Sequence, residues 1–233
     1  MKKQKYMKPL IVANWKMNPS TIKEVKELFG GFKKLDAVIC PPACFLNSKI
    51  LPSGKKFALG AQNCHWEEKG PFTGEISPKT LKSLGVEYVI VGHSERRNHF
   101  QETDEMINKK LKAALKFGLI PILCIGEKEG EDAKMIVEKQ IAEDLKEILK
   151  TEAGKIIIAY EPVWAIGTGN FCEPQKAKNV LNLIKEKINS IVLYGGSVNS
   201  KISADYIKVG FDGLLVGGAS LDAEEFIKIV KNV

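Results

Sequence analysis

The chain has 233 residues, 44 % of them hydrophobic and 27 % charged, and a formal net charge of +7. This composition is typical of a folded globular protein and excludes disordered and fibrous classes, and no apolar run approaches the roughly 20 residues of a membrane span. Because residues 1–8 alone supply four lysines, and lysines elsewhere alternate with glutamates, the charge does not predict a nucleic-acid-binding surface.

The first residues and the cysteines indicate the cellular compartment. Residues 1–8 are basic, but only the short apolar run 10–13 follows them, so a secretory signal is not predicted. The five cysteines are odd in number, scattered and without a C-x-x-C pair: Cys40, Cys44, Cys64, Cys124 and Cys172. We therefore expect a cytoplasmic protein with reduced thiols and no zinc site, which carries a basic extension at residues 1–8.

Short apolar or β-branched runs alternate with segments of helical periodicity along the chain. The predicted strands, in chain order, are residues 10–14, 37–40, 57–61, 88–92, 120–125, 156–160, 191–195 and 213–216. Between them, the periodicity predicts helices that include residues 22–32, 107–117, 135–149, 175–188 and 223–230. The strands are almost continuously apolar, which is typical of a parallel sheet that is covered on both faces.

Eight such units predict one domain, residues 9–233, that folds as a closed (β/α)8 barrel of the α/β class. The alternative is an open, doubly wound sheet. That fold normally has fewer strands and a glycine-rich phosphate fingerprint after the first strand, where this chain has residues 14–18 instead.

Candidate catalytic side chains follow the ends of several predicted strands. Asn14 and Lys16 follow the first strand, His93 the fourth and Glu161 the sixth. Because all strands of such a barrel run in the same direction, the loops after them gather on one face. We therefore expect these side chains to converge there, although they lie far apart in the sequence.

Glycine-rich turns follow the last two predicted strands. Gly195, Gly196 and Ser197 end the seventh strand, and Gly217 and Gly218 end the eighth. Bare backbone N–H groups near helix N-termini bind phosphate, and barrels often hold a phosphate after these two strands. The alternative is that glycine serves only tight turns with positive φ. The joint position of the two turns favours a phosphate-ester substrate.

Glu161 directly precedes residues 162–169, a segment with the features of a hinged lid. Pro162 restricts the backbone at its entry, Gly167 and Gly169 free the backbone at its exit, and Ile166 supplies an apolar tip. Closure would remove water from the Glu161 carboxylate and increase its basicity. The alternative is a solvated acid followed by ordinary turns.

His93 and Lys16 are the other candidates for chemistry. His93 is suited to act as an electrophile or a proton shuttle. Lys16 is a candidate for a fixed cation beside an oxyanion, for a Schiff base, or for a surface lysine. Cys124 lies within an apolar strand and is expected to pack there, and Glu95 is a candidate for an ion pair. With three histidines and no cluster at ligand spacing, we expect no metal or other cofactor.

An ordered set of motifs extends along nearly the whole chain. They occupy residues 13–18, 60–63, 72–77, 91–97, 124–127, 160–169, 194–198 and 212–221. In these motifs the sequence resembles the triosephosphate isomerase family, whose members are TIM barrels.

The resemblance implies an isomerase that interconverts dihydroxyacetone phosphate and glyceraldehyde 3-phosphate through an enediolate, in glycolysis and gluconeogenesis. It implies Glu161 as the base and His93 as a neutral electrophile. It also implies that Asn14 and Lys16 contact the substrate, and that Glu95 tethers Lys16. The residues that it assigns to phosphate binding are Gly167, Ser197, Gly217 and Gly218. Thr73 is implied to reach toward the neighbouring site in a homodimer.

The chain departs from the family pattern in three places. The stretch between residues 170 and 191 is shorter than usual, Asn170 replaces a lysine, and residues 1–8 are additional. Two other functions are compatible with a phosphate-binding barrel. One is an aldolase or synthase that uses a lysine covalently, and the other is a non-catalytic binding protein, which the presence of Glu161, His93 and Lys16 disfavours.

Overall fold

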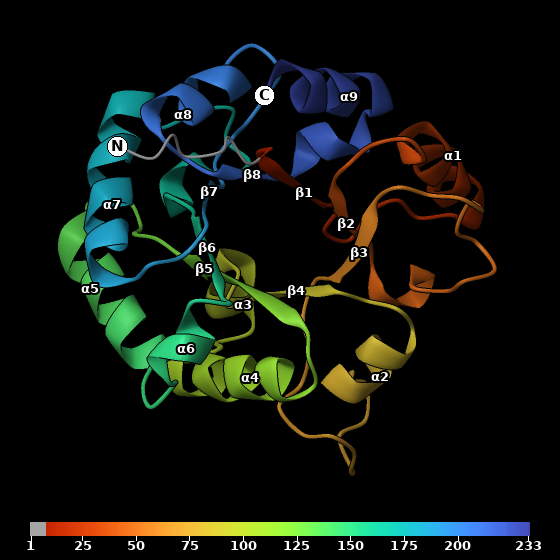
Figure 1. The fold of residues 1–233 in the computed structure, drawn as a ribbon, viewed down its shortest axis with the longest axis horizontal. Coiled ribbons are helices and arrows are strands. Elements are labelled where there is room, and N and C mark those ends of the chain that lie inside the picture. The colour runs from red at the N-terminus through yellow and green to blue at the C-terminus, as the bar shows by residue number, and fades with distance from the viewer. Residues whose placement is uncertain (1–7) are drawn as a thin grey trace.

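The computed structural model describes residues 8–233. Eight parallel strands form a closed barrel, because each strand pairs with the next and the last pairs with the first. The strands are β1 Leu10–Asn14, β2 Val38–Cys40, β3 Ala58–Ala61, β4 Tyr88–Val91, β5 Ile120–Ile125, β6 Ile157–Tyr160, β7 Val192–Tyr194 and β8 Gly213–Val216. Helices form a ring around them (Figure 1). The predicted (β/α)8 barrel is confirmed, and the open-sheet alternative is wrong.

The ring of helices follows the predicted alternation. The helices are α1 Ile22–Phe32, α2 Pro78–Ser83, α3 Ser94–His99, α4 Asp104–Lys116, α5 Ala133–Asp144, α6 Lys150–Ala153, α7 Pro174–Lys187, α8 Ser203–Val209 and α9 Ala223–Asn232. Helix α4 begins at Asp104, earlier than its apolar periodicity predicts, because the Thr103 side chain accepts a hydrogen bond from the Met106 N–H group and caps the first turn. Within residues 8–233, none of the helices is long and apolar enough to span a bilayer.

The single helix predicted over residues 135–149 is wrong. Helix α5 ends at Asp144, Glu147 adopts φ +60°, and the separate helix α6 begins at Lys150. The reason is a contact from α4: the buried Asn108 side-chain amide donates to the carbonyl oxygens of Asp144 and Lys146, both at 2.9 Å. These carbonyls therefore have partners without a continued helix.

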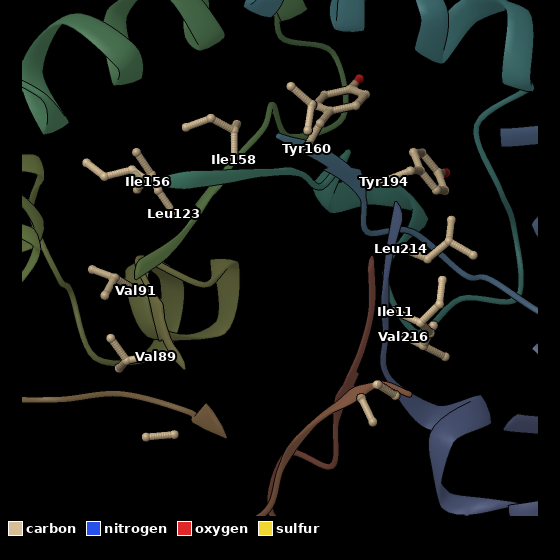
Figure 2. Close-up of a cluster of buried hydrophobic side chains, with 14 of the residues drawn as sticks. Ile11, Val89, Val91, Leu123, Ile156, Ile158, Tyr160, Tyr194, Leu214 and Val216 are labelled. Carbon is tan, nitrogen blue, oxygen red and sulfur yellow. The ribbon is translucent and has the colours of Figure 1, made fainter. Parts of the chain in front are cut away.

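The barrel has two apolar cores, one on each face of the sheet. Ten buried residues fill the interior: Val12, Val38, Cys40, Ile90, Ile122, Cys124, Ile157, Ala159, Leu193 and Leu215. The larger core lies between the strands and the helices, and Figure 2 shows its side chains, such as Val91 and Tyr194, pointing away from the barrel interior. Burial on both faces explains the continuous apolar strands. It also leaves the loops at the strand ends as the place for polar chemistry.

The predicted basic extension, residues 1–8, lies outside the described residues except for Lys8. The Lys8 Nζ is 3.1 Å from the Asp36 Oδ2, and both side chains are exposed. An exposed ion pair of this kind contributes about 0–1 kcal/mol to stability.

Candidate active site

A cavity of about 290 Å³ opens at the carboxyl ends of the strands. Its lining contains every residue predicted to act in catalysis or in substrate binding: Asn14, Lys16, His93, Glu161, Gly167, Ser197, Gly217 and Gly218. These residues come from five strand ends and the predicted lid. The barrel topology therefore brings them together, as the direction of the strands requires.

Glu161 lies directly after β6 and is 4 % exposed. Its backbone N–H donates to the Ile125 carbonyl oxygen at 2.8 Å, which ties it to the end of β5. The carboxylate Oε1 is 3.4 Å from the His93 Nε2, while Oε2 has no hydrogen-bond partner within residues 8–233. A Cβ atom at Gly195 would lie 2.8 Å from the Glu161 Cγ. Glycine is therefore required where this side chain crosses β7.

His93 forms the N-cap of α3, and this contact fixes which of its ring nitrogens accepts a hydrogen bond. The Glu95 backbone N–H donates to the His93 Nδ1 at 3.2 Å. An acceptor nitrogen carries no proton, so a neutral ring must carry its proton on Nε2. That N–H group faces the Glu161 carboxylate and the cavity. The His93 Nε2 is thus placed to donate a hydrogen bond into the cavity.

Lys16 is held in an unusual backbone conformation, with φ +55°. Its N–H donates to the Asn14 Oδ1 at 3.0 Å, and its carbonyl oxygen accepts from the Gln62 Nε2 at 2.8 Å. The two side chains stabilise a conformation that costs a non-glycine residue about 1–3 kcal/mol. Asn14 therefore positions Lys16 from within the same loop, and Gln62 does so from β3.

The Lys16 ammonium group is paired with Glu95, since its Nζ is 2.5 Å from the Glu95 Oε1. Partial burial alone would raise the pKa of Glu95. The hydrogen bond from Lys16 and the positive charge of its ammonium group outweigh this effect and hold the pKa below its ordinary value. The carboxylate thus stays ionised and keeps a fixed cation at the cavity wall.

Backbone amides also line the cavity. The N–H groups of Ser197, Gly217 and Gly218 have no hydrogen-bond acceptor among residues 8–233. None of the glycines at 195, 196, 217 or 218 has positive φ, so the interpretation of these turns as positive-φ turns alone is wrong. At Gly217, a Cβ atom would lie 3.3 Å from the Lys16 Cε. A larger residue at 217 would therefore displace the Lys16 side chain by a few tenths of an ångström.

The lid, residues 162–169, lies against the barrel end. The Trp164 indole N–H donates to the buried Glu127 carboxylate at 2.9 Å, and the Tyr160 hydroxyl donates to the same group. The Ser197 hydroxyl donates to the Ala165 carbonyl oxygen at 2.6 Å. Gly167 and Gly169 have φ of +71° and +77°. Sequence reasoning assigned no role to Glu127, although its place at the end of β5 is a signal for one.

The structure does not bring three of the predicted supporting residues into the cavity lining. Glu95 contacts Lys16 and His93 from outside the lining. Cys124 is buried in the barrel interior, and burial raises the pKa of its thiol, with the nearby Glu161 carboxylate adding to the shift. Thr73 lies in the exposed loop between β3 and α2. Residues 8–233 contain no group of three or more His, Cys, Asp or Glu side chains arranged to hold a metal ion.

A buried carboxylate, an imidazole and a fixed ammonium group therefore face one cavity that free backbone amides also line. This combination in a (β/α)8 barrel defines an enzyme that moves a proton on a small phosphate ester.

Comparison with known proteins identifies the family. The sequence profile of the triosephosphate isomerase family matches residues 9–233. Triosephosphate isomerases of Dictyoglomus thermophilum and Aquifex aeolicus are each 46 % identical to this chain over 96 % of its length and cover 98 % and 99 % of their own. One from Clostridium botulinum is 46 % identical over 95 % of this chain and 98 % of its own.

The chain belongs to the triosephosphate isomerase family. The reaction of this family is the interconversion of dihydroxyacetone phosphate and glyceraldehyde 3-phosphate, in glycolysis and gluconeogenesis. The predicted family and isomerase function are thus confirmed.

Proposed function

We propose that the cavity at the carboxyl end of the barrel is where this chain interconverts the two triose phosphates, with Glu161 as the base and His93 as the electrophile. One observation carries the proposal: the Glu161 Oε1 and the His93 Nε2 are 3.4 Å apart at the cavity wall. A substrate carbon and its carbonyl oxygen can therefore meet the two groups at the same time.

In this mechanism the Glu161 carboxylate removes a proton from the carbon beside the carbonyl group. The electron pair moves onto the carbonyl oxygen and forms an enediolate, which the His93 N–H group and the Lys16 ammonium group stabilise. His93 carries the hydroxyl proton between the two oxygens. Glu161, now protonated, returns its proton to the neighbouring carbon. The Oε2 of Glu161, which has no partner within residues 8–233, supports this role because no protein contact in that region competes for it.

We propose that the substrate phosphate binds to the amides of Gly167, Ser197, Gly217 and Gly218. The lack of acceptors for the last three within residues 8–233 supports this assignment, since these partly or fully exposed N–H groups in the cavity lining are free to donate to an anion. Asn14 lines the same cavity and is the further substrate contact. The fixed Lys16 ammonium group adds charge complementarity.

The first test is a coupled assay with glyceraldehyde 3-phosphate, combined with borohydride treatment in the presence of substrate. We expect turnover, full activity after borohydride, and no increase in protein mass. Lys16 is ion-paired with Glu95, so its amine is not free to attack a carbonyl group. A reduced adduct on Lys16 would indicate the aldolase or synthase alternative, and absence of turnover would contradict the isomerase.

We also propose that the chain acts as a cytoplasmic homodimer in which residues 9–233 form one catalytic domain. Large apolar side chains in two loops support the dimer: Met17 is 91 % exposed and Phe72, beside Thr73, is 39 % exposed. Apolar loop tips of this kind are typical of association surfaces. Sedimentation velocity is expected to give the mass of two chains, and Phe72→Asp should shift it toward one. A wild-type species with the mass of one chain at micromolar concentration would contradict the dimer.

A further inference from the structure

The exit of the lid is held by two tyrosines that lie outside the cavity. Cys172, three residues beyond Gly169, is buried. Its backbone N–H donates to the Tyr194 hydroxyl oxygen at 3.2 Å, and its carbonyl oxygen accepts from the Tyr206 hydroxyl at 2.6 Å. Tyr194 ends β7, and Tyr206 lies on α8. Both polar backbone groups of one residue are thus fixed from two separate elements.

The two tyrosines form a rigid unit. Their rings stack with centroids 3.7 Å apart and planes at 10°, and the Phe211 ring packs beside both at steep angles of 68° and 75°. Both side chains are completely buried. Figure 2 shows Tyr194 directed away from the barrel interior. Burial raises the pKa of Tyr206 to about 12, so the hydroxyl keeps the proton that it donates to Cys172.

The position of the cavity-lining part of the lid depends on the position of Cys172 at its exit. Ile166 and Gly167 line the cavity, and only residues 168–171 separate them from Cys172. The Ser197 hydroxyl holds the entry half through the Ala165 carbonyl oxygen. Displacement of the exit would move the Gly167 amide away from the site proposed for the phosphate. The hydrogen bond from Tyr206 to Cys172 helps to hold the lid in its present position, although Tyr206 does not line the cavity.

We propose that Tyr206 is a positioning residue for the isomerisation. Through its hydrogen bond to the Cys172 carbonyl oxygen, it stabilises the lid in the arrangement that places Gly167 over the substrate phosphate. The inference rests on the proposed function of the cavity, and it adds a residue that acts on the substrate only through the lid backbone.

The test is Tyr206→Phe, which keeps the stacked ring and removes only the hydroxyl group. Loss of one hydrogen bond to the lid should weaken binding of 2-phosphoglycolate, a phosphate-bearing enediolate mimic, by about threefold to tenfold and lower kcat/KM by a similar factor. A less firmly closed lid should also raise the share of turnovers in which the enediolate expels its phosphate. In that side reaction the C–O bond to the phosphate breaks, and inorganic phosphate is released and can be measured. Loss of stability alone would not change this share.

Tyr88→Phe is the matched control, because Tyr88 begins β4 far along the chain from the lid and should leave all three quantities unchanged. Hydrogen–deuterium exchange over residues 167–173 gives a second measurement, and it should be faster in Tyr206→Phe at equal melting temperature. Unchanged 2-phosphoglycolate binding and phosphate release in Tyr206→Phe, with an active wild type, would overturn this inference alone. A wild type without turnover would instead overturn the proposed function.

Discussion

Glu161→Gln is expected to lose on the order of 10²–10⁴ or more of kcat toward glyceraldehyde 3-phosphate, the usual contribution of a positioned base. The amide has the shape of the carboxylate but cannot accept a proton from carbon. Because the Glu161 side chain crosses Gly195 at close contact, a residue of equal size should fit without rearrangement. The coupled assay measures the rate, and binding of 2-phosphoglycolate checks that the cavity is intact.

Glu161→Asp is the matched variant for this prediction. It keeps the carboxylate but draws it back from the cavity, so its rate should lie between those of the wild type and Glu161→Gln. Exchange of the substrate C–H proton with D2O should fall in parallel with the isomerisation rate. Equal activity of wild type and Glu161→Gln would remove Glu161 from the mechanism.

The second large effect is expected at His93, where two replacements distinguish the role of the ring Nδ1 from that of Nε2. In His93→Asn, the side-chain oxygen can accept the Glu95 N–H bond and preserve the cap of α3, but nothing replaces the donor at Nε2. We expect kcat to fall by about 10²–10³, as when an oxyanion donor is removed. Steady-state kinetics, with circular dichroism as a check on folding, measures the effect.

His93→Gln provides the complementary case, since its longer amide can place an N–H group near the former Nε2. It should retain more activity than His93→Asn, even though it is a poorer match for the helix cap. If the two variants were equally impaired, the ring's role at the N-terminus of α3 would matter more than its N–H group toward the substrate.

The sequence was sufficient to predict the features that depend on local pattern. The eight strands were predictable because burial on both faces makes them continuously apolar, and the convergence of Lys16, His93 and Glu161 then followed from the strand direction. The substrate did not follow from these patterns. It came from the resemblance of whole motifs to one family.

The remaining features depend on contacts between distant residues. The break after Asp144 is fixed by Asn108, which is 36 positions away. Glu147 adopts a positive φ although it is not a glycine, so its residue type does not reveal the turn. The Cys172 carbonyl oxygen is held by a hydrogen bond from Tyr206, which belongs to a helix that the apolar periodicity did not predict. No local window contains such information.

The closure of the sheet also limits how copies of this chain can associate. Every strand of the barrel has a neighbour on both sides, so the described part of the chain has no free strand edge to which another copy could add. Any contact between copies through these residues must therefore rely on loops and helix surfaces. Such an interface can change in strength, or be lost, through single side-chain substitutions that leave the barrel itself undisturbed. Over evolution, any association between copies of this chain can therefore change without a change in the strands of the barrel.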